Sequence, residues 1–307
     1  HPPMPRSHAV AAVAAPAVAV AAAAILAATA SADVTILAPS SSLMEGISST
    51  GTAAGAFNAP QHIMWTPKGG AMSIGGGSPS AGQVKVSEDG MFISSSILNP
   101  STGKEEMGLY DVAAGTWTPL GGLGSSSGDS TSSGWGIAGD GQSVVGLAWI
   151  SAGTAHAAQW FASTNSVVDL GSTVAGESSR ANAADFDGDV VVGWQDGNGR
   201  QGAVWVNGVQ ELITRPDGSP ASEAACVSAN GRWVSGISFS SPFGTAATYL
   251  YDTQLDSVQI IPNLSSGGGS RMAGTAVTDD GQTVVGGTWP LGPATFGTAF
   301  IWRAGIG

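Results

Sequence analysis

Pairs of aspartate or asparagine followed by glycine recur along the chain at a nearly constant spacing. They lie 43 to 51 residues apart, at Asp89-Gly90, Asp140-Gly141, Asp187-Gly188, Asn230-Gly231 and Asp280-Gly281. A short apolar stretch follows each pair, VVG in three of the five copies. Such a pair between two apolar runs is a strong hairpin signal, because a type I′ turn requires positive φ at both central residues. Each pair therefore predicts a β-hairpin with a type I′ turn.

An aromatic residue closes a further short strand in every copy, 18 to 22 residues after the Asp or Asn. An earlier copy without a clear pair ends in the same way. The six aromatic residues are 45 to 51 residues apart, at Trp65, Tyr110, Trp160, Trp205, Tyr251 and Trp302. A turn and a last short strand ending in Leu-Gly or Ile-Gly follow most of them. Each unit therefore contains four short strands.

Repeated four-stranded units of about 46 residues are typical of β-propeller blades. We therefore predict an all-β fold, a β-propeller of about six four-stranded blades, in a single domain over residues 33–307. With 42% hydrophobic residues and 46 glycines, the chain can form a core from many short strands joined by turns. A β-solenoid is the main alternative, but its coils are usually shorter and lack a regular hairpin turn.

The first strand of each unit supports a propeller, because innermost strands crowd around an axis and favour small side chains. The position four residues before each Asp or Asn holds Lys85, Gly136, Ala183, Cys226 and Ala276. The last unit stops just after Trp302, before its fourth strand. Either the N-terminal DVTIL segment (Asp33–Leu37) supplies that strand, or the sequence is truncated at its C-terminus.

The combination AVTDDGQTVVGG…GTAFIW, with the Leu170-Gly171 ending, resembles the probable extracellular HAF-type repeat of exported bacterial proteins. The resemblance extends from about Val84 onward and, more weakly, over the unit before it. It implies an exported tandem-repeat β-protein and transfers no catalytic residue.

Residues 1–32 have the pattern of a secretory signal peptide that is removed on export. Arg6 gives a short basic start, an Ala/Val-rich run follows, and Ala30-x-Ala32 forms a cleavage site before Asp33. No later apolar run approaches the roughly 18–20 residues that a membrane-spanning helix needs, so the mature chain has no predicted transmembrane segment. We expect a secreted, extracellular or periplasmic protein. Cys226 is the single cysteine, so it has no intrachain disulfide partner.

Charge and motifs restrict the chemistry. The formal net charge of -12 disfavours nucleic acid as a partner. After removal of the signal peptide, His62 and His156 are the two histidines left to bind zinc or to act in a Ser-His-Asp relay. No cofactor is predicted. The weak calcium candidate is DFDGD, with Asp185, Asp187 and Asp189 at alternate positions, although the hairpin turn already explains Asp187.

These observations favour a binding or structural module over an enzyme, with a glycan or a protein as the unidentified partner. The alternative is a propeller-type carbohydrate-active hydrolase or lyase, because paired carboxylates can act as general acid and base. No spacing singles out such a pair, and a fold by itself does not license a reaction. A polar, His- or Arg-lined central pocket would favour the enzyme.

Aromatic residues near the ends of the second strands are the candidate ligand-binding residues. Trp149, Phe239 and Trp289 lie nine residues after the Asp or Asn, and Trp194 lies seven residues after it. Strand order places them on the face opposite the hairpin turns, among the connections between blades, where binding is usually located. The alternative is that they pack between neighbouring blades.

Overall fold

A computed structural model of the chain describes residues 42–57, 61–77, 81–239, 246–262, 270–290 and 298–305. Contacts divide the chain into two units, His1–Ile36 and Leu37–Gly307, and all described residues belong to the second. The predicted signal peptide and the DVTIL segment lie outside the described residues. Within the described part of the chain, the regular elements are all β-strands.

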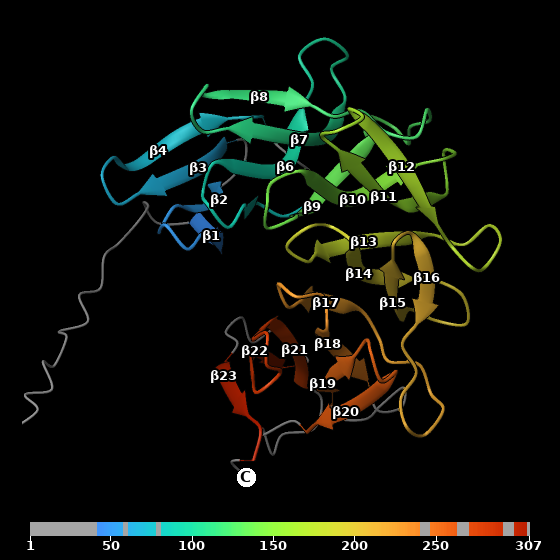
Figure 1. Ribbon diagram of the computed structural model, residues 1–307. Coiled ribbons are helices and arrows are strands. Elements are labelled where there is room, and N and C mark those ends of the chain that lie inside the picture. Colours follow the sequence, from blue (N-terminus) through green and yellow to red (C-terminus); the bar gives the residue numbers. More distant parts are fainter. Residues whose placement is uncertain are drawn as a thin grey trace, which may run out of the picture. The chain divides into compact units, whose positions relative to one another are not determined.

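The strands form six successive antiparallel units, which we call blades 1 to 6. Blade 1 comprises β1 (Ser42–Ile47), β2 (Ala53–Phe57), β3 (Gln61–Thr66) and β4 (Gly70–Gly75). Blade 2 comprises β5 (Lys85–Val86), β6 (Phe92–Leu98), β7 (Glu105–Asp111) and β8 (Thr116–Pro119). Blade 3 comprises β9 (Ser132–Ile137), β10 (Ser143–Trp149), β11 (Ala155–Phe161) and β12 (Ser166–Gly171). Blade 4 comprises β13 (Ser179–Ala184), β14 (Val190–Gln195), β15 (Gln201–Val206) and β16 (Val209–Leu212). Blade 5 comprises β17 (Ala224–Val227), β18 (Trp233–Phe239), β19 (Ala246–Asp252) and β20 (Ser257–Ile261). Blade 6 comprises β21 (Ser270–Val277), β22 (Thr283–Pro290) and β23 (Thr298–Arg303). Figure 1 shows the blades of this unit following one another in chain order.

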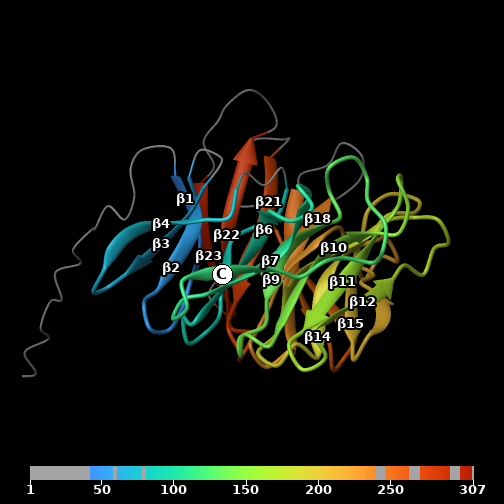
Figure 2. The same cartoon turned by 90° about the horizontal axis from the view of Figure 1, so that it is seen from above.

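Strand order within a blade follows the chain, so the predicted four-stranded repeat is confirmed for blades 1 to 5. Because successive strands are antiparallel, the turns between first and second strands lie on one face, here called the turn face. The loops between second and third strands and the connections between blades lie on the opposite face, here called the connection face. The view in Figure 2 shows the strands running between loops at their two ends.

The predicted hairpins are confirmed, but their predicted turn type is wrong. The glycines at positions 90, 141, 188, 231 and 281 have φ between 66° and 80°, whereas none of the preceding Asp or Asn residues has a positive φ. Instead, the side-chain Oδ1 of each Asp or Asn accepts a hydrogen bond from the backbone N–H two residues later, at 2.8–3.4 Å. These residues are therefore selected as turn acceptors. Positive φ at two consecutive turn residues occurs instead at Asn207-Gly208, between β15 and β16.

The turn glycines also let neighbouring blades approach closely. A Cβ on Gly141 would lie 2.6 Å from the Phe92 ring of the preceding blade, and one on Gly281 would lie 2.5 Å from the Trp233 ring. Backbone hydrogen bonds then connect successive turns, as from Gly139 N to Asp185 O at 3.2 Å. Thr50-Gly51 occupies the corresponding place in blade 1, where Gly51 has a φ of 83°. The repeated pair is therefore a blade-packing signature as well as a turn signal.

A β-bulge in the first strand explains the glycine that ends the VVG element. The first strands of blades 1, 3, 4, 5 and 6 each shift register by one residue against the second strand. Opposite this bulge stand Gly55, Gly146, Gly193, Gly236 and Gly286. A Cβ on any of them would lie 1.9–2.1 Å from a carbonyl oxygen of the first strand or of the residue just before it. Glycine is required here because a bulge brings the two backbones together.

The six predicted aromatic residues all lie in third strands. In blades 2 to 6 each pairs with the residue four positions after the turn Asp or Asn, as Trp205 pairs with Val191. Trp205 is fully buried and its Nε1 donates to Leu170 O of blade 3 at 2.9 Å. The third-strand tryptophan of blade 4 thus packs against the preceding blade.

Blade 6 ends the described chain with three strands, and no fourth strand follows β23 among the described residues. The side of blade 6 on which a following blade would pack is partly exposed, with Val285 37% exposed and Ile301 53% exposed. The corresponding positions of blade 3, Val145 and Gln159, are buried against blade 4. No described strand of blade 6 pairs with a described strand of blade 1.

Candidate functional site

The aromatic residues predicted for ligand binding lie at the ends of second strands, as expected. Trp149 ends β10 and is half-buried, with its Nε1 donating to Ser130 Oγ at 3.4 Å. Trp194 lies in β14 and is only 5% exposed. Phe239 lies at the end of β18 and Trp289 lies in β22, but their side chains fall outside the described residues. Of the two described side chains, Trp149 alone is accessible.

Trp194 belongs to a stack of alternating aromatic rings and guanidinium groups. The guanidinium carbon of Arg180, in β13, lies 3.5 Å from the ring centroid of Trp135 in β9, and 5.1 Å from that of Trp194. The guanidinium carbon of Arg200 lies 3.6 Å from the Trp194 centroid. Cation–π contacts at such distances fix the orientation of a planar guanidinium group. We call Trp135, Arg180, Trp194 and Arg200 the Trp–Arg stack.

Two carboxylates and one amide complete the stack. Glu223, which precedes β17, accepts a hydrogen bond from Arg180 Nη2 at 2.5 Å and lies 3.6 Å from Arg200 Nη1. Asn182 accepts from Arg180 Nε at 2.7 Å and donates to Glu223 at 3.0 Å. Asp196 accepts from Arg200 Nε at 3.2 Å. Burial lowers the pKa of Arg180, and the charge of Glu223 acts in the opposite direction.

The stack joins blades 3 and 4, its partner Glu223 connects it to blade 5, and no motif singled out in the sequence predicted this cluster. A signal was present in the repeat. Trp135 and Asn182 each stand five residues before a turn Asp, at the bulge of the first strand, and Arg180 and Glu223 stand seven residues before a turn residue. A bulge re-aims side chains, so residues at these positions can point between blades. Charged residues there are conspicuous in a chain with 10 Lys and Arg residues.

His62 has a structural role between blades 1 and 2. Its Nδ1 lies 2.9 Å from Gly75 O, and its Nε2 lies 2.8 Å from Ser95 Oγ. Because a carbonyl can only accept, Nδ1 carries the proton and Nε2 accepts from the serine hydroxyl. Burial lowers the pKa of His62, which favours this neutral form. Ser95 replaces the bulge glycine of the other blades, and β5 is too short to contain a bulge.

His156 forms an ordinary cross-strand pair on the outer part of blade 3. Its Nδ1 lies 2.9 Å from Asp169 Oδ1, between β11 and β12. The Asp169 side chain is 42% exposed, so this pair lies at the protein surface.

The three carboxylates of the calcium candidate occupy different environments. Asp185 is 6% exposed and its Oδ1 accepts a hydrogen bond from Val190 N at 3.0 Å. Asp187 and Asp189 are exposed in the turn. Burial, the largest effect, raises the pKa of Asp185 from 3.8 to about 6. Within the described part of the chain, no group of three His, Cys, Asp or Glu side chains is arranged to hold a metal ion.

Of the first-strand positions expected to hold small residues, one holds a large residue, Lys85. Cys226 is buried, and burial raises the pKa of its thiol to about 12. Lys85 is also largely buried, and its Nζ donates to Glu45 O of blade 1 at 3.0 Å. Burial lowers the pKa of this lysine. Blade 2 accommodates the long side chain because it bonds to the neighbouring first strand.

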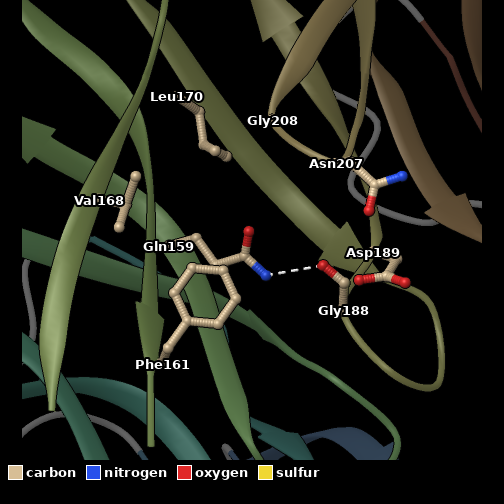
Figure 3. A pocket seen from close by; sticks show the side chains of 8 residues that line it. All are labelled: Gln159, Phe161, Val168, Leu170, Gly188, Asp189, Asn207 and Gly208. Carbon is tan, nitrogen blue, oxygen red and sulfur yellow. Dashed lines mark hydrogen bonds between the residues drawn. The ribbon is translucent and has the colours of Figure 1, made fainter. Parts of the chain in front are cut away.

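A small pocket of about 280 Å³ lies between blades 3 and 4, away from the Trp–Arg stack. Its lining residues are Gln159, Phe161, Val168, Leu170, Gly188, Asp189, Asn207 and Gly208 (Figure 3). The side-chain amide of Gln159, in β11, donates a hydrogen bond to Gly188 O at 2.8 Å (Figure 3). This pocket is smaller than the roughly 300–1,000 Å³ of typical ligand sites, and its most buried polar group is already bonded within the protein.

Comparison with known proteins gives structural neighbours only. No family model and no curated protein matches the chain. The β-propeller domain of the Trilobed protease from Pyrococcus furiosus is 12% identical with a TM-score of 0.54, over 88% of this chain and 83% of that one. A putative TolB from Agrobacterium tumefaciens is 14% identical with a TM-score of 0.52, over 86% and 91%. Oligogalacturonate lyase from Vibrio parahaemolyticus is 10% identical with a TM-score of 0.52, over 88% and 81%.

The likeness to TolB from Acinetobacter baumannii has a TM-score of 0.47, and the chain spans 56% of the length of that protein. At these identities the neighbours show the fold alone. The repeated four-stranded blades and the structural neighbours together define the chain as a β-propeller, which confirms the predicted fold class. Among the described residues, no helix is long and apolar enough to cross a membrane.

Proposed function

We propose that this chain is an exported, non-catalytic β-propeller that binds a glycan through its connection face. The observation that carries the proposal is the group of polar side chains that the Trp–Arg stack, Glu223 and Asn182 gather from three blades. Aromatic rings beside hydrogen-bonding side chains are the chemistry that recognises sugars, since a sugar ring presents both apolar faces and hydroxyl groups. The half-buried Trp149 lies on the same face.

The state of the carboxylates supports binding over hydrolysis or elimination. Glu223 is engaged by Arg180, and Asp196 is engaged by Arg200. A carboxylate whose oxygens already contact an arginine is less available to exchange a proton with a substrate. Export rests on the signal-peptide pattern of residues 1–32, with Asp33 as the first residue of the mature protein.

A glycan array tests the proposal. Labelled protein from Asp33 onward should retain defined glycans, and the triple variant Trp149→Ala, Phe239→Ala, Trp289→Ala should lose them. Phe186→Ala is the matched control, because this aromatic side chain is 46% exposed but lies on the turn face. Retention of no glycan by the wild type would reject the proposal, and so would loss of binding in the Phe186 variant alone.

A further inference from the structure

We propose that Arg200 receives a single carboxylate of an acidic sugar at the connection face of blade 4. The inference rests on the proposed glycan-binding function and names the sugar class. Arg200 follows β14, its side chain is 41% exposed, and its guanidinium carbon lies 3.6 Å from the ring centroid of Trp194. The stack therefore presents an arginine of fixed orientation to solvent.

The hydrogen bonds of Arg200 leave its outer edge available. Among the described residues, the only hydrogen bond that Arg200 donates runs from Nε to Asp196. Its Nη1 lies 3.6 Å from Glu223, which is an ion pair beyond hydrogen-bonding distance. The two Nη groups of an arginine match the two oxygens of a carboxylate in a bidentate pair. An arriving carboxylate thus competes only with a long contact.

Arg180 makes this arrangement possible. It holds Glu223 at 2.5 Å, so the charge of Glu223 stays compensated when Arg200 turns to a ligand. The indole N–H of Trp194 is buried without a hydrogen-bond partner, although the ring is 5% exposed. An unsatisfied buried donor is normally disfavoured, and this one belongs to the ring over which Arg200 lies.

The surroundings favour a short acidic sugar over a protein or a long polyanion. Among the described residues, the connections around blade 4 at 172–178, 196–200 and 213–223 expose one large hydrophobic side chain, Val174 at 39%. Protein partners usually require exposed apolar anchors. The net charge of -12 also repels an extended polyanion, whereas a single carboxylate needs only the Nη edge of Arg200.

Matched probes test the sugar class. A glucuronic acid-terminated oligosaccharide, its methyl ester and the glucose-terminated equivalent differ at one group. We expect wild type to bind the acid about ten- to a hundredfold more tightly than the other two, as one charge-assisted pair predicts. Arg200→Lys retains the positive charge but loses the fork and the stacking, and it should abolish most of that preference. The effect is measured as the ratio of acid to ester affinity within each protein, so a general loss of glycan binding is distinguished from a loss of the preference.

Arg232→Lys is the control, because Arg232 also stacks on a tryptophan, at 4.7 Å, and pairs with Asp252, but on the turn face. It should keep the preference for the acid. Equal binding of acid and ester would overturn the Arg200 assignment while leaving glycan binding intact. Binding of an acidic peptide through Arg200, with no binding of any sugar, would overturn both proposals.

Discussion

Replacing Asp185 with serine should stabilise the protein at alkaline pH. Asp185 is buried where blades 2 and 5 have Ser87 and Ser228, two residues before the turn Asp or Asn. Both serines accept a hydrogen bond from the backbone N–H five residues later, at 3.0 Å. Asp185 accepts the equivalent bond from Val190 at 3.0 Å. Serine can therefore take over the contact of Asp185 without its charge.

The magnitude follows from the pKa of Asp185. Burial raises it from 3.8 to about 6, so folding favours the protonated carboxyl. The stability that this group contributes is fully present below its unfolded pKa and is lost as pH rises through about 6. A difference of about two pKa units corresponds to a penalty of about 3 kcal/mol at pH 8 and about 1 kcal/mol at pH 4.5.

Urea unfolding at pH 8 and pH 4.5 measures this difference. The free energy of unfolding of Asp185→Ser, relative to wild type, should be about 2 kcal/mol more favourable at pH 8 than at pH 4.5. Asp189→Ser removes an exposed carboxylate from the same turn and is the matched control. A difference that does not vary with pH, or a loss of stability at pH 8, would refute the account of Asp185 as a buried carboxyl forced toward its neutral form.

Three further predictions concern packing and export. Gly146→Ala places a Cβ 2.0 Å from Ser133 O and should lower the free energy of unfolding by at least about 2 kcal/mol, whereas Gly153→Ala, with no neighbour within 4 Å, should be nearly neutral in the same denaturation assay. Trp205→Ala should cost about 3–5 kcal/mol, because the ring is fully buried, and an unchanged melting temperature would contradict this. N-terminal sequencing of the exported protein should find Asp33 at or near its start, and a retained leader would contradict the assigned cleavage site.

The repeat in the sequence contains most of the fold. The period of the turn pairs and of the aromatic residues predicts the number of blades, their four strands and the third-strand place of Trp205, because each blade repeats one local pattern. The turn type was predicted wrongly, because Asp-Gly is compatible with several turns and only the φ values show which one forms. The VVG element shows Gly146 in the sequence. The need for glycine there comes from the bulge in β9, and the sequence around Gly146 does not show that bulge.

The candidate site depends on tertiary structure. Trp135, Arg180 and Glu223 are separated by 45 and 43 residues and come together because the first strands of blades 3, 4 and 5 lie side by side. Spacing along one strand cannot show which side chains meet between blades. The same limit applies to Trp194, a candidate ligand-binding residue in the sequence, which the structure buries beneath Arg200. Local turn and strand chemistry thus determined the blades, whereas contacts between blades decided which polar side chains face solvent together.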